Sequence, residues 1–198
     1  MQIDPAALSA PERYQLMIQC LVPRPIAWVS TVSPAGAANL APFSFFGGVT
    51  AAPFTVMVSV GRRRSGAHKD TARNLLDTGE AVIHIPHRPL AEAMVKSSAE
   101  VDPGVDEFAL TGLAKTPSVR VAPPRVASAA IAMEARRVQH FEVGTAPVDL
   151  FLLEVLLVHV ADEFYQAGNI DPARLNAVGR LGGSSYCNTT AVFDVPRP

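Results

Sequence analysis

The chain has 198 residues, of which 48% are hydrophobic and 18% are charged, and its formal net charge is −1. This composition excludes an intrinsically disordered protein and favours one folded domain with a sizeable buried core. The near-neutral charge also excludes the broad basic face that a nucleic-acid-binding protein needs.

Neither a membrane span nor an exported protein is expected. No apolar stretch reaches membrane-spanning length, and the N-terminal "MQIDPAALSAPERYQ" lacks the basic start and apolar centre of a signal peptide. Cys20 and Cys187 lie far apart, without a CxxC or Cys/His ligand spacing, so we expect two buried free thiols rather than a disulfide or a metal site. The sequence thus predicts a soluble cytoplasmic protein.

The first half of the chain predicts four strands after a helical lead-in at residues 1–22. Residues 24–33 and 38–46 mix β-branched and aromatic residues, and the "PAGA" between them offers turn chemistry, so they are expected to form a hairpin. Two further apolar runs, at residues 53–61 and 80–86, predict the third and fourth strands.

Two short helices are expected beside these strands. "KDTARNLLDTG" (69–79) reads as a helix with Asp70 as its N-cap and Gly79 as its stop. "PLAEAMVKSSA" (89–99) begins with a proline and carries its apolar residues on one face, which is typical of a second helix.

The second half returns to strands after an irregular surface connection at residues 101–126, which is rich in proline and glycine. Residues 127–144 and 148–163 are the longest extended candidates, and a last short strand is expected within 184–195. Because 148–163 is apolar on both faces apart from Glu154 and His159, we expect burial on both sides, within a barrel or against a second subunit.

These elements predict a mainly β (α+β) fold. The simplest arrangement is an antiparallel β-barrel with a few flanking helices. No internal repeat and no domain boundary is visible, so residues 1–198 are expected to form a single domain.

A polar cluster at the start of the first expected helix predicts an anion site. Lys69 and Thr71 lie where a strand passes through a glycine-flanked loop into the helix, so free backbone N–H groups and the helix dipole point at one spot. No Asp or Glu lies between Arg13 and Lys69, whereas six cations fall in this range, ends included. The local positive charge suits a small anionic ligand; the alternative is an ordinary capped helix with solvated charges.

A second stretch, "NLAPFSFFGG" (39–48), is suited to a planar ligand. Asn39 and Ser44 stand among aromatic residues, with a proline and a glycine pair, so backbone amides can lie beside a flat apolar surface. The alternative is that the phenylalanines belong to the core. This alternative must hold for at least one of them, because strand neighbours face opposite sides.

Four stretches carry a resemblance to a known family: "RPIAWVST", "NLAPFSFF", "KDTARN" and "RLGGSSYCNT". In this order they resemble the flavin reductase-like family, from about Pro23 to Pro198. The resemblance implies a Greek-key split β-barrel that binds FMN, with FAD a less favoured alternative, and a homodimer. It also implies the cofactor-binding residues, which are Thr31, Asn39, Leu40, Ala41, Ser44, Phe45, Phe46, Ser59, Gly61, Arg62, Lys69, Asp70 and Thr71.

Within that set, the resemblance places the FMN phosphate near Ser59, Gly61, Arg62, Lys69 and Thr71, and the isoalloxazine ring along the remaining strand residues. It also implies a reductase that takes electrons from NAD(P)H and passes them to free flavin or to a partner such as a monooxygenase. No catalytic side chain and no metal are expected, because the flavin supplies the chemistry. "DEF" (106–108) and "ADE" (161–163) are interpreted as solvated turns.

One departure from the family pattern bears on the reductant. Many members carry a Gly-Asp-His turn before a strand like "LFLLEV", and here Val148 stands where the histidine would fall. This leaves open a non-enzymatic FMN-binding electron carrier resembling flavoredoxin. A pyridoxal phosphate site built on Lys69 and Thr71 is a third, less favoured reading. His84 is interpreted as a satisfied core histidine rather than a catalyst.

Overall fold

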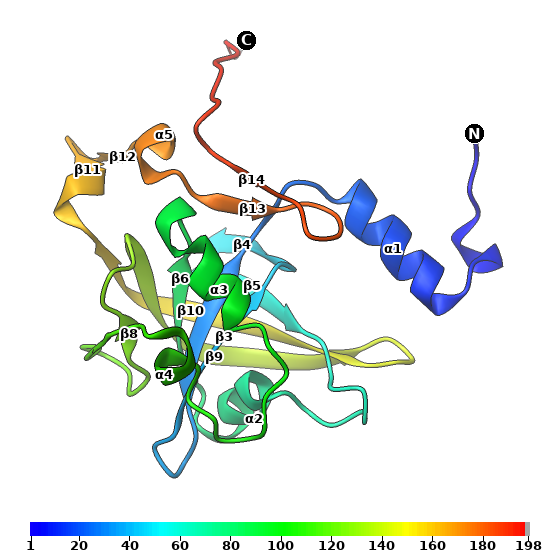
Figure 1. Ribbon diagram of the computed structural model, residues 1–198, viewed down its shortest axis with the longest axis horizontal. Helices are drawn as coiled ribbons and strands as arrows, with labels where there is room; N and C mark the ends of the chain where they lie inside the picture. The colour runs from blue at the N-terminus through cyan, green and yellow to red at the C-terminus, as the bar shows by residue number, and fades with distance from the viewer. Residues whose placement is uncertain (197–198) are drawn as a thin grey trace.

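The computed structural model describes residues 1–196 (Figure 1). The helices are α1 (Ala10–Cys20), α2 (Asp70–Asp77), α3 (Ala91–Lys96), α4 (Glu107–Thr111) and α5 (Pro172–Leu175), with short 3-10 helices η1 (Pro5–Ala7), η2 (Arg88–Leu90) and η3 (Asp162–Phe164). The strands are β1 (Arg24–Pro25), β2 (Ala27–Val32), β3 (Ala38–Phe43), β4 (Phe46–Ala51), β5 (Phe54–Val60), β6 (Glu80–Ile85), β7 (Lys115–Thr116), β8 (Arg125–Val126), β9 (Ile131–Val143), β10 (Val148–Val160), β11 (Tyr165–Gln166), β12 (Asn169–Ile170), β13 (Val178–Arg180) and β14 (Tyr186–Asn188). No helix in this range is long and apolar enough to cross a membrane.

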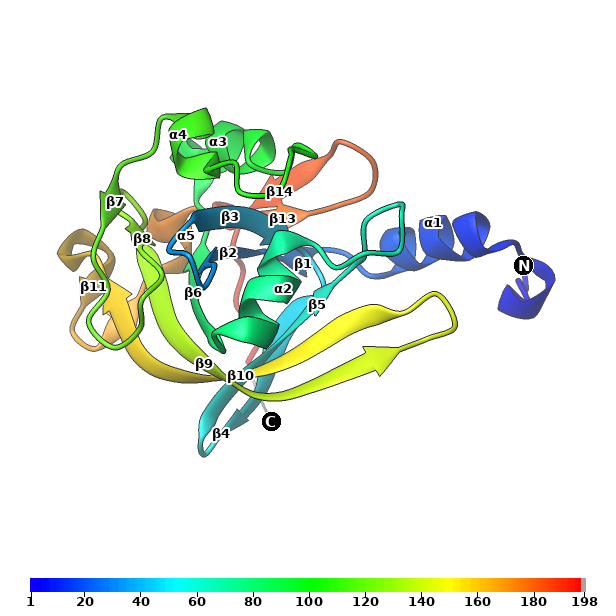
Figure 2. The same ribbon diagram turned by 90° about the horizontal axis from the view of Figure 1, so that it is seen from below.

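Seven antiparallel strands form the main sheet, in the order β3-β2-β6-β9-β10-β5-β4. The sheet curls into a barrel, and Figure 2 shows α2 between β3 on one side and β9 and β10 on the other. The two edge strands, β3 and β4, are consecutive in the chain and are separated only by Ser44 and Phe45. The predicted mainly β antiparallel barrel with flanking helices is therefore confirmed.

The barrel interior is filled by the inward side chains of five strands. These side chains include Ala27, Val29, Val56, Val58, Val60, Ile83, Ala135, Phe151 and Leu153, all 3% exposed or less. Helix α2 adds Ala72 and Leu75 to the same cluster. Burying a leucine of this kind contributes about 2 kcal/mol, so the apolar face of α2 helps to hold the helix against the barrel.

The connection that carries α2 determines where a site can form. It joins β5 to β6, which follow each other in the chain but are separated in the sheet by β10 and β9. This crossing is of the Greek-key type. Helix α2 begins one residue earlier than the sequence suggested, with Lys69 as the N-cap and Asp70 as the first helical residue. Gly79 has a φ of +74°, so it ends the helix as expected.

The predicted strand at 38–46 is divided in the structure. The predicted hairpin is confirmed for its first part, since β2 and β3 pair from Ala27↔Phe43 to Val32↔Ala38. After Phe43 the chain leaves β3, and β4 pairs instead with β5 at the far edge of the sheet. Hydrophobicity alone does not reveal this break, because the residues on both sides of it are equally apolar.

Strand β10 alternates more clearly than its sequence suggested. Phe151 and Leu153 point into the barrel, whereas Leu150 and Leu152 lie half-buried on its outer face. One end of the outer face is covered, because Val121 from the 101–126 segment packs with Leu156. At the other end Leu150 and Leu152 stay only half-buried among the described residues, so burial on both sides is only partly achieved within one chain.

A second, smaller sheet lies beside the barrel and was not expected from the sequence. It joins β1, β13 and β14, and it brings the C-terminal segment next to Arg24. Helix α1 projects away from the barrel, as Figure 1 shows. Both cysteines are free as predicted, but Cys20 at the end of α1 is exposed and Cys187 in β14 is half-buried, so the expectation of two buried thiols was wrong.

His84 is the satisfied core histidine that the sequence predicted. It is fully buried, Nδ1 lies 2.9 Å from the Trp28 carbonyl oxygen, and the Val126 N–H donates to Nε2 at 2.9 Å. Because Nε2 accepts this bond, the neutral ring carries its proton on Nδ1. Burial, with a further effect of Arg125, lowers the pKa of His84 from 6.5 to about 4.

This lowered pKa predicts acid sensitivity. As the pH falls from 6.5 to about 4, the imidazole is protonated in the unfolded chain but stays neutral in the folded protein. The free energy of unfolding therefore decreases by about 3 kcal/mol over this range. The His84→Asn variant keeps a donor toward Trp28 but no titrating ring. Urea unfolding at pH 7 and pH 4 should show that the free energy of unfolding decreases more in the wild type than in His84→Asn. Equal decreases in the two proteins would contradict the lowered pKa of His84.

Candidate functional site

Two adjoining cavities form a groove along β3. The first, of about 250 Å³, lies against the start of α2, and the second, of about 220 Å³, lies toward β1 and β13. Pro42, Phe43 and Ser98 line both cavities. The first cavity is walled by Asn39, Ala41, Arg63, Lys69, Asp70, Thr71, the segment 97–101 and Glu107. Five of the thirteen predicted cofactor-binding residues therefore line it together.

A buried polar cluster fixes the geometry of the first cavity. The amide of Asn39 donates to Thr71 Oγ1 at 2.8 Å and to Thr31 Oγ1 at 3.3 Å, and Asn74 donates to Thr31 Oγ1 at 3.0 Å. All four residues are at most 7% exposed. The cluster binds α2 to β2 and β3, so three predicted site residues hold the start of the helix against the strand.

The mouth of the first cavity carries cationic donors that the protein leaves available. Within residues 1–196, Lys69 Nζ makes no hydrogen bond or ion pair, and the buried Nε of Arg63 has no partner. The Arg63 guanidinium reaches Asp70 Oδ2 at 2.9 Å, which anchors the loop to the helix. Helix α2 presents its N-terminal N–H groups at the same place, so this end suits an anion such as a phosphate group.

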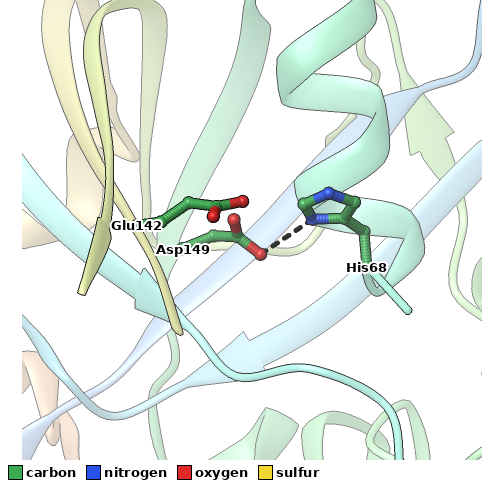
Figure 3. Close-up of side chains that lie close together, drawn as sticks. All are labelled: His68, Glu142 and Asp149. Atoms are coloured by element: carbon green, nitrogen blue, oxygen red, sulfur yellow. Dashed lines mark hydrogen bonds and ion pairs between the residues drawn. The ribbon is translucent and has the colours of Figure 1, made fainter. Parts of the chain in front are cut away.

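Arg62, which the resemblance placed beside the phosphate, points to a different cluster. Its Nη2 reaches Asp149 Oδ1 at 3.1 Å and also pairs with Glu142. His68 binds the same carboxylate at 2.9 Å, as Figure 3 shows. His140 binds it from β9 at 3.0 Å. The structure thus brings Arg63, rather than Arg62, to the cavity wall. Three consecutive arginines on a loop offer no pattern that could have distinguished them.

The carboxylate of Asp149 is the centre of this cluster. Its side chain is fully buried, which by itself raises the pKa. Hydrogen bonds from His68 and His140, with the attraction of Arg62, outweigh burial and hold the pKa of Asp149 below its ordinary value. The cluster therefore ties the 61–69 loop to β9 and β10.

The same cluster includes a possible metal-ligand set. Ligand atoms of His68, Glu142 and Asp149 lie within 4.8 Å of one another. The guanidinium of Arg62, however, pairs with both carboxylates. Arg62 thus offsets one of the two negative charges that would attract a cation, and these residues are better described as an ion-pair network.

Glu107 was interpreted as part of a solvated turn, and this was wrong. It lies in α4, is 4% exposed, and its Oε2 accepts the Leu40 N–H at 2.9 Å. Burial raises the pKa of Glu107 against the effect of this hydrogen bond. Glu107 therefore adds a carboxyl group to the first cavity and fixes the backbone of Leu40, whose own side chain belongs to the core.

The remaining predicted residues lie near the second half of the groove and on the adjacent strands. Ser44 lines the second cavity and accepts from Arg24 Nε at 3.3 Å, and the Arg24 guanidinium lies 5.7 Å from the Phe45 ring centre. The Ser59 N–H donates to the Phe45 carbonyl at 2.9 Å. Phe46 packs against the barrel core, and Gly61 directly follows β5.

Taken together, the groove has a cationic end, a polar middle and a flat wall formed by Ala41, Pro42 and Phe43. No histidine or cysteine is among the described residues that line the two cavities, and the imidazoles of His68 and His140 are engaged by Asp149. This arrangement can bind a planar ligand with an anionic tail. Chemistry at such a site would come from the ligand rather than from a side chain.

Known proteins are similar to this chain in sequence and in fold. A family model described as a flavin reductase like domain matches residues 19–173. An uncharacterized protein of Halalkalibacterium halodurans, BH2278, is 38% identical over 202 aligned positions, covering 100% of this chain and 97% of the relative. Nitrilotriacetate monooxygenase component B from Bacillus cereus has a TM-score of 0.95 and 32% identity over 98% of both chains. A split-barrel protein of Shewanella frigidimarina shares the fold, with a TM-score of 0.86 and 21% identity over 100% of both.

The Asp149 cluster generates a stability prediction. Asp149→Asn removes a buried carboxylate that three cationic or imidazole groups share, so it should lower the free energy of unfolding at pH 7 by about 3 kcal/mol and speed hydrogen exchange in the 61–69 loop. Because the folded pKa is lowered, this stabilisation is present above the unfolded pKa and is lost as pH falls through the folded pKa.

The control is Glu142→Gln, which removes only the partner whose side chain is 55% exposed. This variant should cost less than about 1 kcal/mol in denaturant unfolding. Asp149 would not be the centre of the cluster if both variants lowered the free energy of unfolding equally. The same would follow if the stability difference between wild type and Asp149→Asn did not decrease at low pH.

Proposed function

This chain belongs to the flavin reductase like domain family, and from that premise we propose that it is an oxidoreductase that binds FMN in the β3 groove and passes electrons from NAD(P)H to free flavin or another acceptor. The observation that carries the proposal is the groove itself. A phosphate-sized cationic end, with Lys69 and the Arg63 Nε lacking partners within residues 1–196, adjoins a flat apolar wall on β3.

The residues present fit FMN. Lys69, Arg63 and the first N–H groups of α2 would hold the phosphate, while Glu107 and Asn39 line the polar middle of the same cavity. The ring would lie against the β3 wall toward Ser44. Bound FMN would supply hydride and electron transfer; the protein's part is to neutralise the phosphate, fix the ring and shield one of its faces.

FMN is favoured over FAD because the start of α2, with Lys69 unpaired within residues 1–196, offers a place for a single phosphate group. The first cavity measures about 250 Å³, below the roughly 300–1,000 Å³ of sites that enclose drug-sized ligands. It therefore suits the tail of a mononucleotide better than a complete dinucleotide.

The chain lacks the histidine that the family pattern places on the nicotinamide side of the flavin. Val148, at the position of the family histidine, begins β10 and offers no imidazole. The nearby His68 and His140 are both bound to Asp149. This favours a second candidate function, an FMN-binding electron carrier resembling flavoredoxin, in which no nicotinamide need approach the flavin.

An exposed apolar patch on the outside of the barrel supports a homodimer. Met57 faces Leu152 and Phe141 faces Leu150, so these four side chains form an outer apolar patch on β5, β9 and β10. Met57 and Phe141 are 37% and 46% exposed. A second copy covering the patch would complete the burial that the sequence of β10 predicts. A monomer mass by light scattering at micromolar concentration would refute this assembly.

The similar component B from Bacillus cereus is, by its name, part of a monooxygenase. A partner monooxygenase that consumes reduced flavin is therefore the acceptor that we propose for the reductase. We also propose that the protein acts in the cytoplasm, where two free thiols are stable.

Stopped-flow absorbance separates the two candidate functions. FMN-loaded protein is mixed without oxygen with NADH and, separately, with NADPH, and the flavin band is followed. Rapid bleaching by either nucleotide establishes the reductase and identifies its donor. A persistent band, with FMN demonstrably bound, would reject the reductase in favour of the electron carrier.

Lys69→Ala tests the phosphate end. Losing a charge-assisted phosphate contact should weaken FMN binding by about 1–3 kcal/mol, measured by fluorescence titration. The helix should persist, because Lys69 makes no side-chain cap hydrogen bond. Arg64→Ala, an exposed cation on the same loop, is the control and should change affinity little. Unchanged affinity in Lys69→Ala would refute this placement of the phosphate.

A further inference from the structure

Glu107 is a buried carboxyl group in the wall of the first cavity, and the protein engages only one of its two oxygens. Oε2 accepts the Leu40 N–H at 2.9 Å, whereas no other residue within 1–196 donates to Oε1 or forms an ion pair with the group. We propose that Oε1 accepts a hydroxyl of the polyol chain that joins the flavin ring to its phosphate, which makes Glu107 a specificity-determining residue. This inference rests on the proposed function and deepens it.

Helix α4 holds Glu107 in place before any ligand arrives. The Asp106 side chain accepts the Phe108 N–H at 3.0 Å and so caps the helix. Phe108 is 1% exposed and belongs to the same core cluster as Leu40. Thr111 Oγ1 donates to the Glu107 carbonyl at 2.6 Å. The acceptor is thus pre-organised, which lowers the entropy cost of binding a ligand to it.

The bond to Leu40 fixes the free oxygen beside the edge of β3. This strand is the last of the main sheet, so its alternate N–H groups point away from β2 toward the groove. The Leu40 N–H is one of them and is taken by Glu107. Pro42, the next residue on that side, has no N–H. At these two positions the strand edge therefore offers a ligand no free backbone donor, and Glu107 adds an acceptor instead.

This position lies between the two ends of the groove. Asn39, which precedes Leu40, is bonded to Thr71 at the start of α2 and so marks the cationic end. The flat β3 wall begins directly after Leu40. With a phosphate at α2 and a ring along β3 toward Ser44, the chain that connects them passes Glu107.

The charges around Glu107 select a donor that carries no negative charge. Asp70, a second acid of this cavity, is paired with Arg63 at 2.9 Å and with Arg73 at 3.8 Å. Glu107 has no such pair, and burial, with a further effect of Asp70, raises its pKa. A hydroxyl supplies the hydrogen-bond donor that a buried carboxyl oxygen needs. A second phosphate would instead bring a like charge next to it.

Three flavins that differ in the substituent on the ring test this contact. Lumiflavin has a methyl group in place of the chain, riboflavin carries the polyol, and FMN adds the phosphate. Fluorescence titration of the full chain gives a dissociation constant for each. The wild type should bind riboflavin roughly fivefold or more tighter than lumiflavin. Equal affinities for these two ligands would overturn the proposal without recourse to any variant.

Glu107→Gln keeps the size of the side chain and an oxygen for the Leu40 N–H, but it replaces the free carboxyl oxygen by an amide NH2 group. Riboflavin binding should weaken roughly fivefold or more, because a charge-assisted hydrogen bond is lost, while lumiflavin binding stays unchanged. Unchanged riboflavin affinity, or equal weakening of both ligands, would refute the contact. Glu92→Gln, an exposed carboxylate on α3 outside both cavities, is the matched control and should behave as wild type. Thermal melting checks that both variants fold.

Lys69→Ala separates this inference from the proposed function. It should weaken FMN and leave riboflavin unchanged, since only FMN carries the phosphate. FMN is not used to judge Glu107→Gln, because removing a negative charge also favours the phosphate. If the wild type bound none of the three flavins, the proposed function would fail and this inference with it. Flavin binding that does not depend on the polyol would reject this inference alone.

Discussion

The buried polar cluster that joins α2 to β2 and β3 is the constraint on which the site depends. Asn39 and Asn74 donate to two threonine hydroxyls with distances of 2.8 to 3.3 Å, in a region without water access. Each unmet bond there would cost about 1–3 kcal/mol, so the helix can take only one position along β3. That position brings the helix N-terminus and Lys69 to the edge of the flat β3 wall.

The three consecutive arginines of the loop before α2 lie in three different environments. Arg62 turns to the buried Asp149, Arg63 pairs with Asp70 at the cavity, and Arg64 stays in solvent. The first pairing fastens the loop to the long β9–β10 hairpin, and the second fastens it to the helix. With the loop held from two sides, Lys69 needs no protein partner of its own. The cationic end of the groove is therefore pre-organised, which lowers the cost of binding an anion.

The two halves of the groove are electrostatically different. The first half mixes Lys69 and Arg63 with Asp70, Glu100 and Glu107, whereas the second half has two guanidinium groups and no acid. A polyhydroxylated tail with a phosphate suits the first half, since both donors and acceptors are present. The shared wall of Pro42 and Phe43 makes the two halves one functional surface.

The sequence by itself determined the barrel class, the β2–β3 hairpin and the helix that ends at Gly79, because these follow from local periodicity and turn chemistry. It also indicated that His84 belongs to the core. It also brought forward Lys69, Thr71 and Asn39 as site residues. Only the tertiary structure decided that Arg63 rather than Arg62 faces the cavity, that Glu107 is buried, and that Arg180 meets Arg24 across 156 positions of chain. Those outcomes depend on which strands pair and on where each charge finds its partner, and contacts between distant segments leave no periodic signal in the sequence.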